Sequence, residues 1–140
     1  MIETFTVGSM QELIDDSPFI AFLGLRIDSL DLEAGSVEAT LPHRREFERG
    51  GPMTGQFHGG VIASLIDVVG DMAVAMKVGG GVPTINFRVD YLRPSAGPAL
   101  KAHGLARRVG RTVGVADVEV FDAEGRLTAV GRGTYSPKIG

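Results

Sequence analysis

The apolar positions between His58 and about Val78 recur with the spacing of a helix. At about 100° per residue, the bulky side chains cover nearly half of the circumference: Val61, Ile62, Leu65, Ile66, Val68, Val69, Met72 and Met76. Ser64, Asp67 and Asp71 fall close together on the far side and form a narrow polar line. The pattern therefore predicts one long helix that is buried along most of its girth.

Shorter apolar segments on both sides of this helix alternate with polar residues, as strands do. Residues 25–28 and 37–41 flank a turn at 33–35 and predict a hairpin. Four further segments follow the helix, at residues 84–92, 99–109, 112–121 and 126–135. The turns between them are too short for helical crossovers, so we expect an antiparallel sheet in which consecutive strands lie side by side.

Helical signals also precede the first strand. We expect Ser9 to cap a short helix that ends at Asp15 or Asp16, and Ser17-Pro18 to begin a second one that ends at Gly24. Residues 1–23 then form a short N-terminal helical segment of a single domain that spans residues 1–140. The predicted fold class is α+β, with an antiparallel sheet of five to six strands wrapped around the one long helix.

Composition and charge narrow the classes of function. The 14 basic and 17 acidic residues give a net charge of −3, which offers no basic surface to nucleic acids. The absence of cysteine excludes disulfides, thiolate metal sites and a cysteine nucleophile. The N-terminal sequence does not resemble a signal peptide, and no apolar stretch reaches the ~20 residues of a membrane-spanning helix. We therefore expect a cytoplasmic protein with neither a nucleic acid nor a membrane as partner.

The sequence Gln56-Phe57-His58-Gly59-Gly60 at the start of the long helix carries the strongest candidate chemistry. Glycine makes up 20 of the 140 residues, about twice its usual share, and here it lets another molecule approach the backbone. The first amides of a helix lack internal acceptors, so they suit an oxygen that becomes negative in a transition state. In the alternative interpretation, Gly59 and Gly60 only permit tight packing, and His58 bonds a nearby carbonyl and orders the loop.

Asp67 is a carboxylate in the middle of an otherwise apolar helix. Such a group is costly to bury unless it is paired or used, so it marks either a solvent-facing edge of the helix or a general base or nucleophile in a pocket. Asp71 lies one turn further on. Two ionised carboxylates this close repel each other, which favours protonation of one; a salt bridge from Asp71 to an arginine is the expected alternative.

Residues Phe57-His58-Gly59-Gly60-Val61-Ile62-Ala63-Ser64-Leu65-Ile66-Asp67 resemble the signature of hotdog-fold thioesterases of the phenylacetate-pathway (PaaI-like) group. Residues 84–94, 108–111 and 131–135 resemble later landmarks of that family, so the similarity runs from about residue 20 to 136. The spacing from His-Gly-Gly to Asp is its most specific part. The resemblance implies a hotdog fold and the hydrolysis of acyl-coenzyme A thioesters, with an aromatic or medium-chain acyl group expected. It also implies a homodimer or homotetramer that needs no cofactor and no metal.

The resemblance assigns roles to individual residues. Asp67 matches the catalytic carboxylate, acting as a base on water or as a nucleophile, and Gly59 matches the residue whose backbone N–H polarises the thioester carbonyl. His58 matches the histidine that supports this loop, and Thr84 matches a Ser or Thr that helps to position the attacking water. The candidate substrate-binding residues are Gly60, Gln56, Ser64, Asp71, Arg93 and Arg111. For the phosphates of coenzyme A we expect Arg111, together with one of Arg93, Arg44 or Arg45.

One departure from the family pattern concerns the loop before the helix. Similar enzymes often carry Asn or Gln six residues before the histidine, where this chain has Pro52; Gln56 is the candidate replacement. Two other functions stay open: a non-catalytic acyl-coenzyme A sensor module and, with less support from the spacing, an acyl-thioester hydratase or dehydratase.

The separation of the candidate residues also predicts how the site is built. His58 and Asp67 lie about 180° apart around one helix and roughly 13 Å apart along it. A single chain therefore places them poorly for one small reacting group, and we expect each site to combine two subunits related by a twofold axis.

Overall fold

The computed structural model describes residues 4–53 and 55–139; position 54 and the two ends of the predicted domain, residues 1–3 and 140, lie outside the described residues. Within that part of the chain, six strands form one antiparallel sheet: β1 (Arg26–Asp31), β2 (Ser36–Pro42), β3 (Thr84–Tyr91), β4 (Ala99–Val109), β5 (Gly114–Phe121) and β6 (Leu127–Tyr135). Three α-helices accompany the described sheet, α1 (Val7–Asp15), α2 (Pro18–Leu23) and α3 (Gly59–Val78), with the short 3-10 helices η1 (Arg45–Phe47) and η2 (Gly51–Met53). None of the helices in the described part combines the length and the apolar character needed to cross a membrane.

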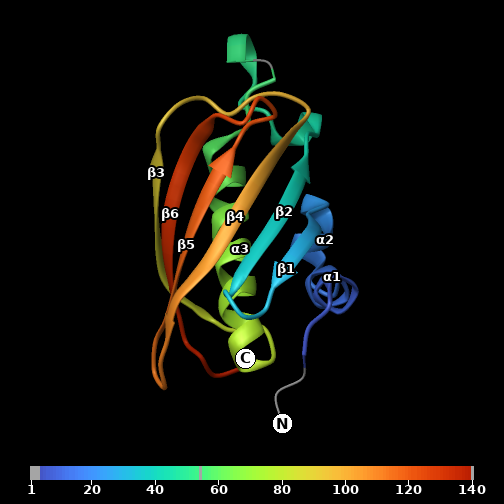
Figure 1. Cartoon of the computed structure of the whole chain (residues 1–140). Coiled ribbons are helices and arrows are strands. Elements are labelled where there is room, and N and C mark those ends of the chain that lie inside the picture. The colour runs from blue at the N-terminus through green and yellow to red at the C-terminus, as the bar shows by residue number, and fades with distance from the viewer. Residues whose placement is uncertain (1–3, 54, 140) are drawn as a thin grey trace.

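The long helix predicted for residues 58–78 is confirmed as α3, which lies along one face of the sheet (Figure 1). His58 is its N-cap: the side chain accepts a hydrogen bond from the Gly60 amide. Gly79 ends the helix at φ +96°, a left-handed conformation that glycine adopts without strain. The apolar girth of α3 is buried against the strands and supplies much of the core.

The fold class predicted from the sequence, α+β with a hotdog arrangement, is confirmed, and the sheet has six strands. The expectation that consecutive strands lie side by side is wrong for β3. The strand order is β1-β2-β4-β5-β6-β3, so β3 pairs with β6 at one edge and β4 pairs with β2. The reason is visible in Figure 1: residues 92–98 cross the ends of β6 and β5 before β4 begins. A short connection thus spans two strands rather than making a hairpin.

The N-terminal helices agree with the sequence pattern except at one cap. Thr6, not Ser9, is the N-cap of α1; Ser9 is the reciprocal partner in a capping box, so the prediction for Ser9 is wrong. The second helix is confirmed, with Ser17 as its cap and Gly24 at φ +71° after its end. These helices cover part of the core through buried apolar residues such as Met10.

Several glycines lie within the strands beneath α3, where the helix and the sheet approach each other closely. A Cβ atom built at Gly104 would lie 2.7 Å from Cγ1 of Val69 and 3.0 Å from its carbonyl oxygen. At Gly131 it would lie 2.6 Å from Cγ2 of Ile66. The high glycine content therefore serves helix–sheet packing as well as the loops, a use that the sequence pattern did not reveal.

Candidate functional site

A pocket of about 520 Å³ opens at the N-terminal end of α3, where the loop before the helix meets the chain that follows β3. We call it the Gly59 pocket. It is lined by Arg49, Gln56, Phe57, His58, Gly59, Gly60, Ile62, Tyr91, Leu92, Arg93, Pro94 and Ser95. Five residues predicted from the sequence thus come together here: Gln56, His58, Gly59, Gly60 and Arg93.

The loop that enters α3 is fixed by backbone hydrogen bonds on both sides. The Phe57 amide donates to the Ser95 carbonyl at 2.8 Å, and the His58 amide donates to the Phe47 carbonyl at 2.7 Å. Phe57 and Phe47 are both buried, which anchors the loop in the core. The start of the helix is therefore held against the core by these two hydrogen bonds and two buried rings.

The hydrogen bonds at the start of α3 leave one amide available. Nδ1 of His58 accepts from the Gly60 amide at 2.9 Å, so His58 orders the loop through an amide and not through a carbonyl as expected. The Tyr91 hydroxyl donates to the Gly59 carbonyl at 2.6 Å. The Gly59 N–H makes no hydrogen bond to any of the described residues. It is thus a free donor at the positive end of the helix dipole, suited to an oxygen that gains negative charge.

Asp67 lies two turns further along α3, half-buried, beside the first residue of β3. The Thr84 hydroxyl donates to Oδ1 of Asp67 at 2.8 Å, so these two predicted residues are in contact. The Tyr135 hydroxyl donates to the backbone carbonyl of Asp67 at 2.9 Å. Burial, with smaller contributions from the charges of Asp67 and Asp71, raises the pKa of Tyr135. The phenol therefore stays protonated and holds this turn of the helix against β6.

Asp71 does not form the expected salt bridge: it has no ion pair with any described arginine. Its Oδ1 accepts from the Val82 amide at 3.2 Å, in the connection between α3 and β3. Burial raises the pKa of Asp71 to about 7; the Val82 hydrogen bond opposes this shift and the charge of Asp67 adds to it. The carboxyl group thus faces the helix–strand connection and meets a backbone donor instead of a cation.

The other candidates around the loop are held by neighbours. Oε1 of Gln56 accepts from Arg49 at 3.3 Å, which keeps the amide beside the Gly59 pocket, whereas Pro52 is exposed in η2. The Arg44 guanidinium lies 4.6 Å from the centre of the Phe22 ring and donates to the Phe22 carbonyl. Arg44 is therefore engaged in packing, and Arg45 is exposed at the start of η1. Of these three predicted arginines, Arg93 is the one that lines the Gly59 pocket.

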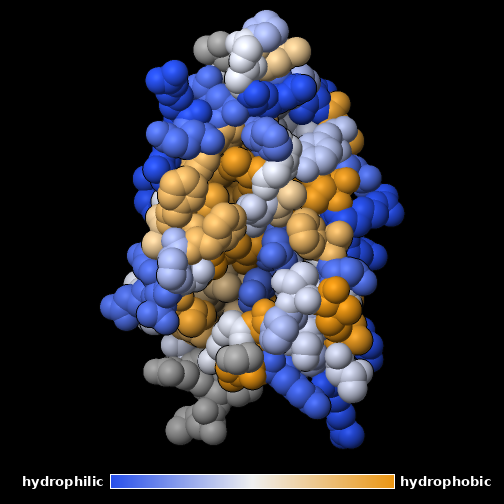
Figure 2. Space-filling model, turned by 180° about the vertical axis from the view of Figure 1, so that it is seen from behind, coloured by the Kyte–Doolittle hydropathy of each residue, from blue (hydrophilic) through white to orange (hydrophobic). Residues whose placement is uncertain are grey.

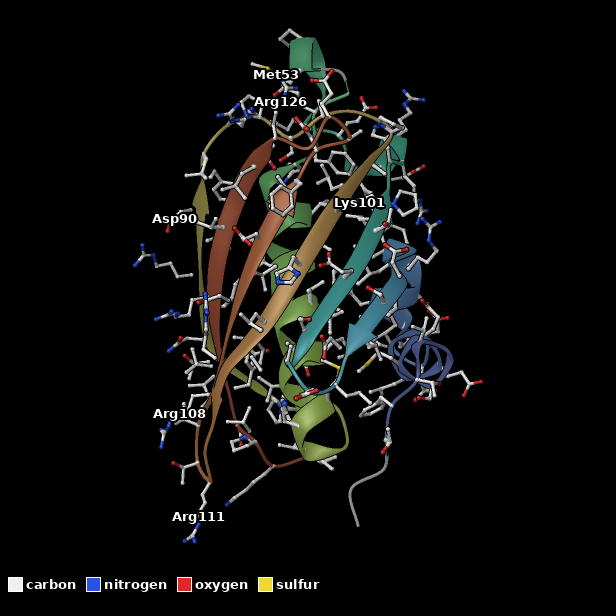
Figure 3. The ribbon with its side chains drawn as sticks, viewed as in Figure 1. Met53, Asp90, Lys101, Arg108, Arg111 and Arg126 are labelled. Carbon is white, nitrogen blue, oxygen red and sulfur yellow. The ribbon has the colours of Figure 1, made fainter. Side chains whose placement is uncertain are left out.

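One chain does not bring all of the predicted residues together. The Asp67–Thr84 pair does not line the Gly59 pocket, because the eight residues from Gly59 to Asp67 span about 12 Å of helix. Ser64, between them, donates its hydroxyl to the Gly60 carbonyl at 2.9 Å. Arg111 lies at the tip of the β4–β5 hairpin, at the end of the molecule opposite to Met53 (Figure 3). The main predicted site residues thus lie in three separate parts of one chain: the Gly59 pocket, the Asp67–Thr84 contact and the tip of the β4–β5 hairpin.

The sheet face turned away from α3 carries a second hollow, of about 580 Å³. Its charged side chains pair with one another: Arg107 and Arg132 both bind Asp117, at 2.7 and 2.6 Å. The hydrogen bond from Arg132, followed by that from Arg107, lowers the pKa of Asp117 despite its partial burial. This hollow holds none of the residues predicted to act, and no group of three or more potential ligands among the described residues would hold a metal ion.

Two residues that sequence reasoning left without a role contribute to these arrangements. Tyr91 and Tyr135 each place a hydroxyl on a backbone carbonyl of α3, at Gly59 and at Asp67. Both tyrosines lie in segments that carry the family resemblance, a signal that could have identified them.

Comparison with known proteins relates this chain to a family. Residues 54–129 match the model described as the thioesterase superfamily. A Halobacterium salinarum protein named "Putative esterase" is 37% identical, over 90% of this chain and 88% of its own length. The Escherichia coli medium/long-chain acyl-CoA thioesterase YigI is 34% identical, over 56% of this chain and 60% of its own.

A solved structure is also similar to this chain. The Escherichia coli PaaI protein, from the phenylacetic acid degradation operon, matches with a TM-score of 0.76 at 25% identity, covering 92% of this chain and 93% of that one. The resemblance to PaaI-like proteins inferred from residues 57–67 is thereby confirmed.

Proposed function

Because the chain belongs to the thioesterase superfamily, we propose that it hydrolyses the thioester bond of an acyl-coenzyme A to a free carboxylic acid and coenzyme A. The observation that carries the proposal is the contact between the Asp67 carboxylate and the Thr84 hydroxyl. Together with the unpaired Gly59 amide at the start of the same helix, it supplies the two parts that acyl transfer to water requires.

The proposed chemistry assigns one step to each group. Asp67 either takes a proton from the attacking water or attacks the thioester carbonyl carbon itself. In the first route the water oxygen forms the new C–O bond, the C–S bond breaks, and the sulfur leaves as the thiol of coenzyme A with the proton that Asp67 took. In the second route the acyl group is bonded to the Asp67 carboxylate as the C–S bond breaks, and water then hydrolyses this anhydride, which releases the carboxylic acid and supplies the proton of the thiol. The Gly59 amide binds the carbonyl oxygen as its charge grows, and the Thr84 hydroxyl keeps the carboxylate oriented towards the reacting atoms.

We assign the Gly59 amide and the Asp67 carboxylate of each site to different subunits. β3 is an edge strand whose outer side has no partner within the described sheet, and it exposes Ile85, Phe87 and Tyr91 to 54, 39 and 52%. Figure 2, viewed from the α3 side, shows hydrophobic residues exposed around a hollow that holds hydrophilic side chains. An open apolar strand edge is a natural surface for pairing with a second copy.

The two ends of β3 explain why pairing would complete the site. Thr84, at the first end, contacts Asp67, and Tyr91, at the last end, contacts Gly59. In an antiparallel pair of β3 strands around a twofold axis, the Tyr91 end of one chain lies opposite the Thr84 end of the other. The Gly59 pocket then faces the partner's Asp67, and two equivalent sites result.

The same symmetry brings the arginines into reach of one ligand. Arg93 follows β3 at its Tyr91 end, whereas Arg111 lies beyond the other end of the sheet. Reversal of the partner chain places the partner's Arg111 at the Arg93 end. We assign both arginines to the phosphates of coenzyme A, and an aromatic or medium-chain group to the acyl side. The name of the Escherichia coli relative, a medium/long-chain acyl-CoA thioesterase, supports the medium-chain alternative.

Thiol release from a panel of aromatic, short-chain and long-chain acyl-coenzyme A thioesters tests the activity. Asp67→Asn keeps the shape of the side chain and removes its charge, so it should bind substrate and lose on the order of 10²-fold or more in rate. A variant that hydrolyses its best substrate within a few-fold of wild type would exclude Asp67. Tight binding of the panel by the wild type without any hydrolysis would favour a sensor instead.

Mixing two inactive variants tests the shared site. Gly59→Pro removes the amide proton at a first helical position that accepts proline, after a His58 whose ψ of 141° also accepts one. When this variant exchanges subunits with Asp67→Asn, a mixed dimer carries one site with both defects and one with neither. Activity should return to about half of wild type per mixed dimer. Exchange that is verified by mass spectrometry but restores no activity would refute the shared site.

A further inference from the structure

Two hydrogen bonds, one helical turn apart, tie α3 to the chain that enters β3. Asp67 accepts from the Thr84 hydroxyl, and Asp71 accepts from the Val82 amide. Val82 lies two residues before Thr84 and is only 6% exposed, so its amide is fixed in the core. The polar line of α3 thus contacts two neighbouring positions of one segment.

We propose that Asp71 is a positioning residue for the Asp67–Thr84 pair: it holds the entry of β3 against α3, and its negative charge, when present, acts on Asp67. The proposal rests on the proposed function in one respect, namely that Asp67 is the reacting carboxylate.

Apart from the buried Val82 side chain, the segment that Asp71 holds has few anchors. Gly79, Gly80 and Gly81 precede Val82, and three consecutive glycines give the backbone wide conformational freedom. Thr84 is exposed, and the pairing of β3 with β6 is irregular between Thr84 and Asn86. Besides Asp71, the anchors here are the Ser136 amide on the Pro83 carbonyl and the pairing of Thr84 with Tyr135. Loss of the Val82 hydrogen bond should therefore let the Thr84 hydroxyl move away from Asp67.

Among the described residues, no Lys, Arg or His forms an ion pair with Asp71. The groups that face it are the Asp67 carboxylate on α3, the Tyr135 phenol on β6 and the Val82 amide on the connection. The phenol stays protonated, because burial raises the pKa of Tyr135. Burial likewise raises the pKa of Asp71 to about 7, so the group is neutral below that pH and negative above it.

Ionisation of Asp71 affects the reaction through repulsion. A negative Asp71 repels the Asp67 carboxylate, and this repulsion is relieved when Asp67 takes up a proton or bonds to the acyl carbon. Ionised Asp71 therefore raises the free energy of the ground state more than that of the transition state, and the free energy of activation falls. We expect the rate of the chemical step to rise as the pH increases through about 7.

Two substitutions separate the geometric part from the electrostatic part. Asp71→Asn keeps an oxygen that accepts from Val82 but cannot ionise, so kcat should lose the rise near pH 7 while KM stays unchanged. Asp71→Leu removes the acceptor, so kcat should fall about tenfold or more at every pH, and the Val82 amide should exchange its proton faster. Asp16→Asn, an exposed aspartate after α1, is the matched control and should behave as wild type.

A measurement without turnover keeps this test separate from the test of the proposed function. The carboxyl carbon of Asp71, followed by NMR, should titrate near pH 7 in the wild type and at lower pH in Asp67→Asn, where the repelling charge is absent. A carboxyl that does not titrate between about pH 6 and 8, or an Asp71→Asn variant whose kcat profile matches wild type, would overturn the electrostatic part. An Asp71→Leu variant with undiminished kcat would overturn the positioning part. Full activity of Asp67→Asn would count against the proposed function and the effect of Asp71 on the rate, whereas the titration of Asp71 and the proton exchange of the Val82 amide would still test how Asp71 holds the entry of β3.

Discussion

Thr84 and Tyr135 hold Asp67 from two sides, the first through its carboxylate and the second through its backbone carbonyl. The family resemblance points to Asp67 and Thr84 as separate site residues, with Thr84 expected to position water, but it does not predict the hydrogen bond between them. The sequence does not predict the partner of Asp71, because the Val82 amide reaches that carboxyl only along the path that the chain takes after Gly81. An arginine partner was therefore expected where a backbone donor is found.

The burial of Asp71 has a measurable effect on stability. An unfolded aspartate ionises near pH 3.8, whereas folded Asp71 stays protonated up to about pH 7. The folded chain thus binds more protons between these values, and its free energy of unfolding falls as the pH rises from about 4 to 7. Asp71→Asn removes this dependence while it keeps the acceptor for Val82.

Asp71→Asn should therefore match wild type below pH 4 and exceed it by a few kcal/mol above pH 7. Urea unfolding at several pH values measures the difference, with Asp16→Asn as the control that should change little at any pH. A difference of the same size at pH 4 and at pH 8 would contradict the assignment.

α3 is close to the sheet because the strands beneath it carry glycine. The helix itself is predictable from its apolar spacing, and so are its ends, where His58 and Gly79 supply the caps. The cap of α1 was placed wrongly, since Thr6 and Ser9 are the two members of one capping box and either suits the pattern. Glycines inside strands give no such local signal. They are needed because α3, which is distant in the sequence, packs so close to these strands that a side chain would clash.

Gly104→Ala tests this close approach. The added methyl group would meet Val69 at 2.7 Å and its backbone oxygen at 3.0 Å, so the helix must shift. The variant should lose about 1–3 kcal/mol of unfolding free energy, as overpacked cores do. Gly81→Ala, where a Cβ meets nothing within 4 Å and φ is not positive, is the matched control. Equal denaturation midpoints for the two variants would show that the helix accommodates the methyl group.

The sheet of one molecule ends in two unlike edges, β1 and β3. Strand positions were predictable from alternation and turns, but the pairing of β3 with β6 was not, because residues 92–98 carry no signal that tells a crossing from a hairpin. The split of the site between subunits was predicted from the distance between His58 and Asp67, whereas the proposed pairing of two β3 strands rests on the strand order, which leaves the outer side of β3 without a partner in the described sheet.

A charge at the middle of β3 should prevent self-association. Phe87 is 39% exposed and lies near the centre of the strand, so a twofold axis would bring two copies of Phe87→Lys together. We expect this variant to sediment as a monomer where the wild type sediments as a dimer or larger, and to lose activity. Leu32→Lys, at a similarly exposed position beside the opposite edge, should keep the oligomeric state. A dimeric Phe87→Lys protein would exclude β3 as the interface.

The position of β3 at the edge of the sheet also determines when the candidate site can form during synthesis. Residues 84–91 leave the ribosome well before residues 127–135, which are their only neighbours in the described sheet. In that interval both edges of β3 are open and its apolar side chains are unprotected, a state that favours misassembly and capture by chaperones. Thr84 can be set against Asp67 in its final register only when β6 has arrived, so the candidate site is completed only after residues 127–135 have been made.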